Sequence, residues 1–288
     1  MPPMKRILVT GATGTIGRQV VSQLLSTGAR VRAMSRNPDA AGLPPEVEVV
    51  RGDLTDPASL DRCLEGIEVV FLVWTAPAAA VPAAVDRIAK QGRRIVLLTA
   101  PHKTPHPLFQ QTNPMATMFA EIERRIEASG LQWTFLRPGM FAANALSWWG
   151  PQIRSGDVVR WPYADVPTAP IHERDVAAVA VRALLEDGHE GAEYVLTGPE
   201  ALSHREQVAT IGEGIGRPLR CEEISPDEAR REIPFPAPAL DMLLRAWGAA
   251  AGHPALVTST VAEVTGRPAR TFREWVADHA EAFRARLA

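Results

Sequence analysis

A glycine-rich turn near the N-terminus constrains the fold of this chain more than any other segment. Residues 7–10 predict a buried strand and residues 16–26 predict a helix. Between them, we expect Gly11 to permit a tight turn, Gly14 to let the backbone approach a pyrophosphate, and Gly17 to let the helix pack on the strand. The amino end of that helix would offer its free N–H groups to the phosphates. This strand–turn–helix context predicts a dinucleotide-binding loop, formed by Gly11, Thr13, Gly14, Thr15, Ile16 and Gly17.

Short apolar runs alternate with helical stretches through the first half of the chain. After the first strand, the predicted strands span residues 30–34, 47–50, 69–73, 95–98 and 134–136. Helices are predicted between them at 57–64, 79–90 and 115–128. Strictly alternating strands and helices favour a parallel sheet covered on both faces, and right-handed crossovers then give a doubly wound α/β Rossmann sheet.

The regular alternation of strands and helices ends after about residue 140, and fewer strands are predicted beyond it. A helix with Ala/Val periodicity covers residues 175–185, with His172 near its start, and helix-start signals follow at Ser203, Ser225 and Thr271. We therefore expect residues 1–140 to form the dinucleotide-binding domain. Residues 141–288 should form a smaller, mostly helical substrate-side lobe that is partly interleaved with it.

Composition excludes several classes of partner. The net charge is −2, with 46% hydrophobic and 22% charged residues and no long basic run, so neither nucleic acid nor an anionic membrane surface is expected to bind. The longest apolar stretch, residues 69–85, is interrupted by prolines. Cys63 and Cys221 are far apart, which is typical of reduced thiols in a cytoplasmic protein. We expect a soluble protein with a small-molecule substrate and no metal site, and both a monomer and a homodimer remain open.

The end of the second strand predicts which dinucleotide binds. An acidic residue there would hold both ribose hydroxyls of NAD, but the sequence has Ser35 and Arg36. A guanidinium pairs well with a 2′-phosphate, so NADP(H) is favoured over NAD(H). After the third strand, the Asp53 carboxylate could accept a hydrogen bond from the adenine amino group, with Leu54 against the ring. The alternatives are a solvated surface arginine and an ordinary turn aspartate.

Three motifs together resemble the NmrA-like group of atypical short-chain dehydrogenase/reductases. They are Val9-Thr10-Gly11-Ala12-Thr13-Gly14-Thr15-Ile16-Gly17, Gly52-Asp53-Leu54, and the segment from Ser129-Gly130-Leu131 to Arg137-Pro138-Gly139. The resemblance implies a Rossmann fold, dinucleotide binding and oxidoreductase chemistry. It places Val73, Trp74 and Thr75 along the adenosine ribose and pyrophosphate, and Pro138, Gly139 and Met140 beside the nicotinamide. It also implies that Thr99 stands where the family has a catalytic or orienting serine, and that Phe141 and Asn144 begin the substrate wall.

One departure from the family matters for the chemistry. Ordinary members carry Tyr-x-x-x-Lys on the helix before the Ser-Gly turn, and the corresponding positions here are Met115 and Phe119. Neither side chain can donate a proton, and the two tyrosines, Tyr163 and Tyr194, lie elsewhere in the sequence. We therefore expect an acceptor that is already activated, such as a quinone, an enone, an imine or an activated carbonyl, rather than a plain ketone.

Substitute proton donors and a substrate wall can be suggested. His102 or His106, in the loop after the fifth strand, could act as an acid near neutral pH, and Tyr163 could cap the substrate. The alternatives are a solvated loop rim for the histidines and a packed aromatic for Tyr163. An apolar cluster after the sixth strand, which includes Trp148, could form the wall of the pocket, with Asn144 as its polar anchor; core packing between the lobes is the alternative for the tryptophans.

Three functions remain open from the residues. The first is an NADPH-dependent oxidoreductase with an activated acceptor. The second is a non-catalytic sensor that binds NADP and NADPH differently and reports the difference to a protein partner. The third is a non-redox isomerase or cyclase that uses the same cleft. The sensor function predicts loss of the Tyr and Lys pair with an intact glycine loop, and the resemblance to NmrA-like regulators agrees with it. The oxidoreductase is the function that we favour.

Overall fold

The chain folds around one large sheet. In the computed structural model, which describes residues 5–284, seven strands lie in the order β3-β2-β1-β4-β5-β6-β9 and every neighbouring pair is parallel. From β1 the next two strands are added on one side and the strands from β4 onward on the other, so the boundary between β1 and β4 is the topological switch point of a doubly wound fold. The predicted fold class is confirmed. The strands span Arg6–Val9 (β1), Arg30–Ser35 (β2), Glu48–Arg51 (β3), Val69–Val73 (β4), Arg94–Leu98 (β5), Gln132–Pro138 (β6) and Ala192–Leu196 (β9).

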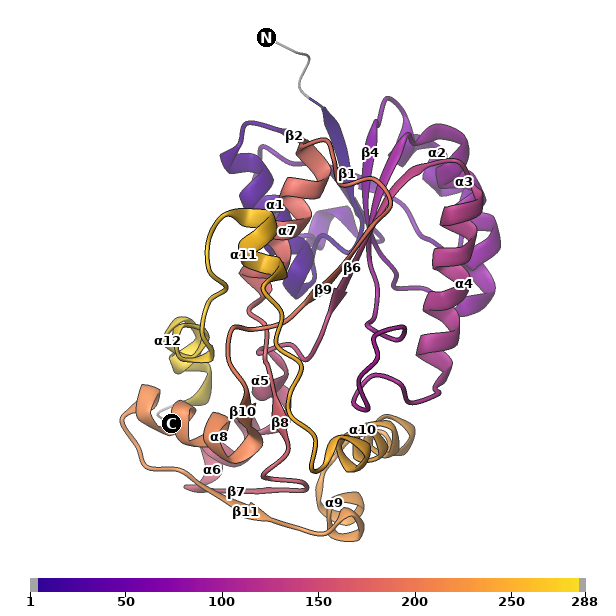
Figure 1. The fold of residues 1–288 in the computed structure, drawn as a ribbon. Coiled ribbons are helices and arrows are strands. Elements are labelled where there is room, and N and C mark those ends of the chain that lie inside the picture. The colour runs from indigo at the N-terminus through magenta and orange to yellow at the C-terminus, as the bar shows by residue number, and fades with distance from the viewer. Residues whose placement is uncertain (1–4, 285–288) are drawn as a thin grey trace.

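Helices cover both faces of this sheet (Figure 1). One face carries α1 (Thr15–Ser26), α7 (Glu173–Leu185) and α11 (Thr260–Thr265). The other face carries α2 (Leu60–Leu64), α3 (Val81–Gln91) and α4 (Pro114–Ala128). Short 3-10 turns precede α2 and α3 at Pro57–Ser59 and Ala78–Ala80, and another lies at Pro38–Ala40.

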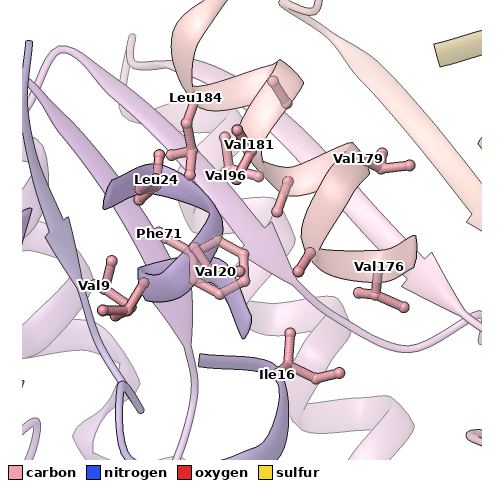
Figure 2. Close-up of a cluster of buried hydrophobic side chains, with 14 of the residues drawn as sticks. Val9, Ile16, Val20, Leu24, Phe71, Val96, Val176, Val179, Val181 and Leu184 are labelled. Atoms are coloured by element: carbon pink, nitrogen blue, oxygen red, sulfur yellow. The ribbon is translucent and has the colours of Figure 1, made fainter. Parts of the chain in front are cut away.

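The interface between α1 and α7 forms the core on one side of the sheet. Figure 2 shows apolar side chains of both helices gathered over β1, β4 and β5. Nine of the thirteen residues of α7 are buried, because its Ala and Val side chains face α1 on one side and the sheet on the other. Each fully buried Val or Leu contributes about 1.5–3 kcal/mol, so this contact is a major source of stability. The labelled members are Val9, Ile16, Val20, Leu24, Phe71, Val96, Val176, Val179, Val181 and Leu184.

The seventh strand is a difference from the sequence-based expectation, which included no strand in this region. β9 comes from the second half of the chain and pairs in parallel with β6, and Leu196 at its end accepts a hydrogen bond from the Gly139 N–H at 2.8 Å. The strand is only partly buried, with Gly191 before it and Gly198 after it. Its pattern Ala-Glu-Tyr-Val-Leu is too short and too mixed to stand out. The sheet therefore contains residues from both sides of position 140.

The remaining elements form a second cluster below the carboxyl ends of the strands (Figure 1). Its core is rich in aromatic rings, among them Trp149, Trp161, Trp247 and Trp275, which are all fully buried. Ser203, Ser225 and Thr271 each begin a helix with a complete capping box, and the His172 side chain accepts from the Arg174 N–H at 3.2 Å, so all four predicted helix starts are confirmed. The elements are α5 (Asn144–Trp148), α6 (Gly150–Ser155), β7 (Val158–Trp161), β8 (Pro167–Thr168), β10 (Leu202–Ser203), α8 (His204–Ile215), β11 (Arg220–Glu223), α9 (Pro226–Glu232), α10 (Ala237–Ala250) and α12 (Phe272–Phe283).

Candidate functional site

The glycine turn lies at the switch point between β1 and β4. Gly11 has φ +59°, and a Cβ there would lie 2.9 Å from the Cβ of Val73 at the end of β4. A Cβ on Gly17 would lie 2.1 Å from the Gly11 carbonyl oxygen, which is closer than any real contact. Both positions therefore need glycine, one for its backbone angle and one for the close approach of α1 to the turn. These constraints match the roles expected for the first and third glycines of a dinucleotide loop.

The amino end of α1 is available to an anion. Its N-cap is Gly14, which has no side chain to satisfy the first-turn N–H groups, and the first turn has no acidic residue. This end borders a cavity of about 310 Å³ that also touches Val73 and Leu98. The positive end of the helix dipole and the unsatisfied N–H groups favour a phosphate at this place. The predicted loop residues at this cavity are Gly11, Gly14, Thr15, Ile16 and Gly17, and the predicted substrate residues are Phe141 and Asn144.

A second cavity of about 300 Å³ lies on the other side of the same turn. The Arg18 side chain shapes it, because its Nε donates to the Thr13 carbonyl at 3.0 Å while its Nη atoms donate to the Ala41 and Gly42 carbonyls. These bonds fix the segment after β2 against the glycine turn. The predicted residues that line this cavity are Gly11, Thr13, Ser35, Arg36, Asp53, Leu54 and Thr75.

Charges of both signs line this second cavity, one from Arg36 and one from Asp53. Arg36 is exposed, and together with Arg51, Arg62 and two aspartates it also lines an adjoining cavity of about 550 Å³. The pKa of Asp53 is lowered, first by the hydrogen bond from the Thr55 N–H and also by the nearby Arg36 charge. Three guanidiniums beside two carboxylates leave a small positive excess around the adjoining cavity.

Two of the predicted cofactor residues have side chains that pack in the hydrophobic core. Leu54 is buried against the helices of the second face, and Trp74 is buried there too, with its indole N–H donating to the Ala76 carbonyl at 2.6 Å. Val73 lies at the end of β4, where the Thr10 hydroxyl accepts its N–H at 2.7 Å. At Leu54 and Trp74, it is therefore mainly the backbone atoms that can still contact a ligand.

A buried charged cluster that was not predicted lies beneath the carboxyl ends of β5 and β6. Glu123 of α4 is fully buried, and its two carboxylate oxygens accept from the Thr99 hydroxyl and from an Nη of Arg137, both at 2.8 Å. The Lys103 ammonium lies 3.0 Å from the same carboxylate, and Arg137 also contacts Glu193 at 3.1 Å. The Thr99 hydroxyl proton is thus committed to Glu123. The only sequence signal was a glutamate two turns after Met115, on the helix face that carries Met115 and Phe119.

The two candidate histidines have different surroundings. His106 is buried, its Nδ1 accepts from the Leu108 N–H at 3.2 Å, and its Nε2 lies 2.8 Å from the Pro254 carbonyl, so both ring nitrogens are engaged. His102 has Nδ1 3.0 Å from the Ala100 carbonyl and Nε2 3.6 Å from the Glu123 carboxylate. Of the two, His102 borders a cavity and has an unpartnered ring nitrogen.

That cavity, of about 190 Å³, has an apolar lining. It lies between the loop after β5, the amino end of α4, and α10. Gly139 and Met140 border it, and the next residue, Phe141, borders the cavity at the amino end of α1. Met115 is 49% exposed and stands in its wall, where the family's tyrosine would be. The two cavities therefore meet at the segment after β6, beside which Pro138 is buried.

Tyr163 and Trp148 lie in the second cluster. Trp148 packs between other rings, 5.7 Å from Trp161 and 5.4 Å from Trp247 between centroids. Tyr163 has φ +51°, and its hydroxyl would lie 2.9 Å from a Cβ on Gly248 of α10. Trp247 is the ring of this group that reaches the apolar cavity. The assignment of Trp148 and Tyr163 to the substrate stays a prediction.

Comparison with known proteins agrees with this geometry. A family model described as NAD(P)H-binding matches residues 11–187, which include the whole glycine turn and the strands from β2 to β6. The chain belongs to this NAD(P)H-binding family. The NmrA-like atypical dehydrogenase/reductase type that the three motifs indicated is thereby confirmed.

Relatives within the family are named as reductases. A (4-alkanoyl-5-oxo-2,5-dihydrofuran-3-yl)methyl phosphate reductase of Streptomyces griseus subsp. griseus is 43% identical, covering 96% of this chain and 99% of the relative. An NAD(P)H azoreductase of Xenophilus azovorans is 36% identical over the same shares of the two chains. The structure of the NADPH-dependent quinone oxidoreductase QOR2 of Escherichia coli, complexed with NADPH, superposes with a TM-score of 0.80 at 26% identity and covers 94% of this chain and 99% of that one.

These findings support the prediction that the chain is an enzyme. The predicted NAD(P)-dependent oxidoreductase of atypical type is confirmed at this level, and NAD(P)H binding is supported by the family model. The sensor and the non-redox enzyme are less favoured, because the relatives above are reductases. Within residues 5–284, no helix has the length and apolar character needed to cross a membrane.

Proposed function

We propose that this chain is an NADPH-dependent reductase. Its acceptors are compounds in which a C=C bond is conjugated to a carbonyl group, which include enones, conjugated lactones and quinones. The observation that carries the proposal is the wall of the apolar cavity beside Gly139 and Met140. At the position of the family's tyrosine this wall has Met115, whose thioether cannot donate a proton.

The neighbouring hydroxyl does not replace the missing acid. The Thr99 hydroxyl donates to the buried carboxylate of Glu123, and giving its proton to an acceptor would leave a threonine alkoxide beside that negative charge. An isolated ketone needs a proton as its oxygen gains charge. A conjugated acceptor delocalises that charge over several atoms, so its protonation can follow from water or from His102. The site therefore suits acceptors that need orientation more than acid catalysis.

The relatives' names fit this class. The named substrate of the Streptomyces griseus relative contains a lactone ring whose C=C bond is conjugated to the ring carbonyl and to an alkanoyl group. A C=C bond polarised by two carbonyls is among the acceptors least dependent on an acid. Quinones, which the name of the Escherichia coli relative specifies, share this property. We therefore place conjugated lactones and enones first and quinones second.

The cofactor would lie across the switch point. NADPH, when bound, supplies the hydride for this chemistry. Its pyrophosphate would rest on the turn from Gly11 to Gly17, its adenosine between Thr13, Asp53 and Thr75, and its 2′-phosphate near Ser35 and Arg36. Its nicotinamide would face Gly139 and Met140, with the acceptor between Phe141 and Asn144. Support comes from the helix end without a side-chain cap and from the arginines beside Arg36.

An acceptor panel tests the reaction. Purified protein should consume NADPH with alkanoyl butenolides, enones or quinones, and much more slowly with matched saturated ketones. Turnover of the saturated ketones with none of the conjugated compounds would refute the proposal. Clearly different affinities for NADP and NADPH without any turnover would favour the sensor. Conversion of a substrate after the nucleotide is stripped would favour the non-redox enzyme.

The choice of dinucleotide is tested by Arg36→Ala. A lost charge-assisted contact should weaken NADPH binding about ten- to a hundredfold and leave NADH binding nearly unchanged. Arg30→Ala is the matched control, since Arg30 is exposed at the opposite end of the same strand, away from the glycine turn. Equal losses for both nucleotides with Arg36→Ala would show that this residue does not recognise the 2′-phosphate.

A further inference from the structure

We infer that the apolar cavity between α4 and α10 binds an uncharged alkyl or acyl chain of the acceptor. This inference rests on the proposed function, because it names the part of the substrate that enters this cavity. Its wall is built by three segments that are distant in sequence and meet beside the end of β6. The apolar residues that form most of the wall are Phe109, Met115, Met140, Met242, Leu243 and Ala246.

Three of the wall residues are methionines, out of seven in the chain. The methionine side chain is unbranched and polarizable, so it adapts its shape to different apolar partners. Met115 is one of only two large apolar side chains that are strongly exposed within residues 5–284. Because Met115 also lines the cavity, it extends the apolar lining out to the surface. This lining suits a chain of variable length or branching.

Most polar groups at the rim are already engaged. The Asn113 side chain accepts from the Ala116 N–H at 2.8 Å and donates to the Gln111 carbonyl at 2.8 Å. The Gln111 amide donates to the Pro107 carbonyl at 3.2 Å, and the Nδ1 of His102 lies 3.0 Å from the Ala100 carbonyl, which leaves its Nε2 without a hydrogen-bond partner. A charged or strongly polar tail would therefore lose more hydration than this one nitrogen can replace, which costs free energy. The cavity selects an uncharged chain.

The size of the cavity limits the length of that chain. A buried apolar cavity of about 150 Å³ holds one benzene molecule. A volume of about 190 Å³ therefore accommodates a chain of about six or seven carbons. Longer chains would emerge past Met115 into solvent, where further methylenes gain little.

The cavity is placed to receive a chain attached to the reacting group. Gly139 and Met140 border it, while Phe141 borders the cavity at the amino end of α1. Gly139 is fixed by its N–H bond to Leu196 of β9, and Met140 accepts the Ile171 N–H at 2.8 Å. An acceptor lying over this fixed segment would direct its substituent toward α10. Chain binding would thus orient the reacting carbons, which is what a site without an acid requires.

Calorimetry with unreactive ligands tests this inference directly. The probes are saturated 2-alkanoyl-γ-butyrolactones with alkanoyl chains of two, four, six, eight and ten carbons, titrated in the presence of NADP. Each buried methylene should lower Kd about fourfold. The decrease should level off at about six or seven carbons, where the cavity is full.

Two variants move that limit in opposite directions. Ala246→Phe fills the cavity, so Kd should level off at a shorter chain while the acetyl compound binds as it does to the wild type. Met242→Ala enlarges the cavity, so the decrease should continue to longer chains; this variant also serves if Ala246→Phe does not fold. Ala237→Phe is the matched control, because Ala237 is exposed on the side of α10 opposite Ala246, does not line the cavity, and should give the wild-type series.

The outcomes separate this inference from the proposed function. A Kd that does not change with chain length, or an Ala246→Phe variant that weakens all lengths equally, would overturn the chain site even if NADPH is consumed. A chain-length dependence without consumption of NADPH on the acceptor panel would retain the chain site and refute the reductase.

Discussion

Replacing Glu123 with Gln should destabilise the protein strongly, although the substitution hardly changes the size of the side chain. Glu123→Gln keeps the shape of the side chain and removes its charge. In the structure this charge faces Arg137, which is 1% exposed, and the carboxylate also accepts the Thr99 hydroxyl proton. Removing one partner of a buried ion pair leaves the other charge uncompensated, which costs about 3–5 kcal/mol.

The structure places the expected value at the lower end of that range. Arg137 keeps one carboxylate, Glu193, at 3.1 Å, although that side chain is 39% exposed and its charge is partly screened. We therefore expect a loss of about 3 kcal/mol in the free energy of unfolding. For a chain of 288 residues, that loss corresponds to a Tm lower by about 5 °C.

Thermal unfolding followed by circular dichroism measures this loss, with Glu193→Gln as the control on the same arginine. The control should lose less than about 1 kcal/mol, because its ion pair is partly exposed. Combining Glu123→Gln with Arg137→Met should recover part of the stability, since the uncompensated charge is then removed. If Glu123→Gln costs no more than Glu193→Gln, the buried cluster does not hold β5, β6 and α4 together as we argue.

Three further perturbations follow from the geometry. Gly17→Ala places a methyl group against the Gly11 carbonyl, so α1 must shift, and NADPH titration by fluorescence should show at least a tenfold weaker Kd; unchanged binding would argue against the close approach. Burial would raise the pKa of Glu173, but the neighbouring imidazoles of His172 and His279 hold it well below its ordinary value of 4.5, and the same carboxylate raises the pKa of His279 above 6.5. The contribution of Glu173 is lost as pH falls through its lowered pKa, and that of His279 is lost as pH rises through its raised pKa. The Tm difference between wild type and His279→Gln should therefore be largest between about pH 4.5 and 6.5 and shrink above that window; a difference that does not vary with pH would contradict the assignment. Thr271→Ala removes the cap of α12 and should cost about 1 kcal/mol in chemical denaturation, whereas no change in midpoint would show that the cap is dispensable.

The sequence could predict which residues gather around the glycine turn because the constraints on these residues are local. A turn between strand and helix specifies where Gly11, Gly14 and Gly17 lie whatever the rest of the chain does. Arg36 follows the next strand, and parallel strands bring their carboxyl ends to one edge of the sheet. The structure accordingly places Gly11, Thr13 and Arg36 around one cavity.

Glu123 and β9 were missed for a different reason. Glu123 is flanked by Glu121, Arg124 and Arg125, a charge pattern typical of a solvated helix face, and only the partners Arg137 and Thr99 reveal that it is buried. β9 has no strong period of its own and becomes a strand because β6 offers it an open edge. Both depend on contacts between residues that are far apart in the chain.

The sequence by itself determined the doubly wound sheet, the glycine turn and the absence of an acid at Met115 and Phe119, since backbone sterics, strand–helix alternation and residue chemistry act over a few positions. Only the tertiary structure decided which side chains share a cavity, which charges are buried, and where α10 meets α4. Burial and proximity are properties of surfaces assembled from distant segments. For this reason the grouping of Gly11, Thr13 and Arg36 at the glycine turn could be predicted before the fold was known, whereas the apolar cavity could be recognised only once the segments that form its wall were in place.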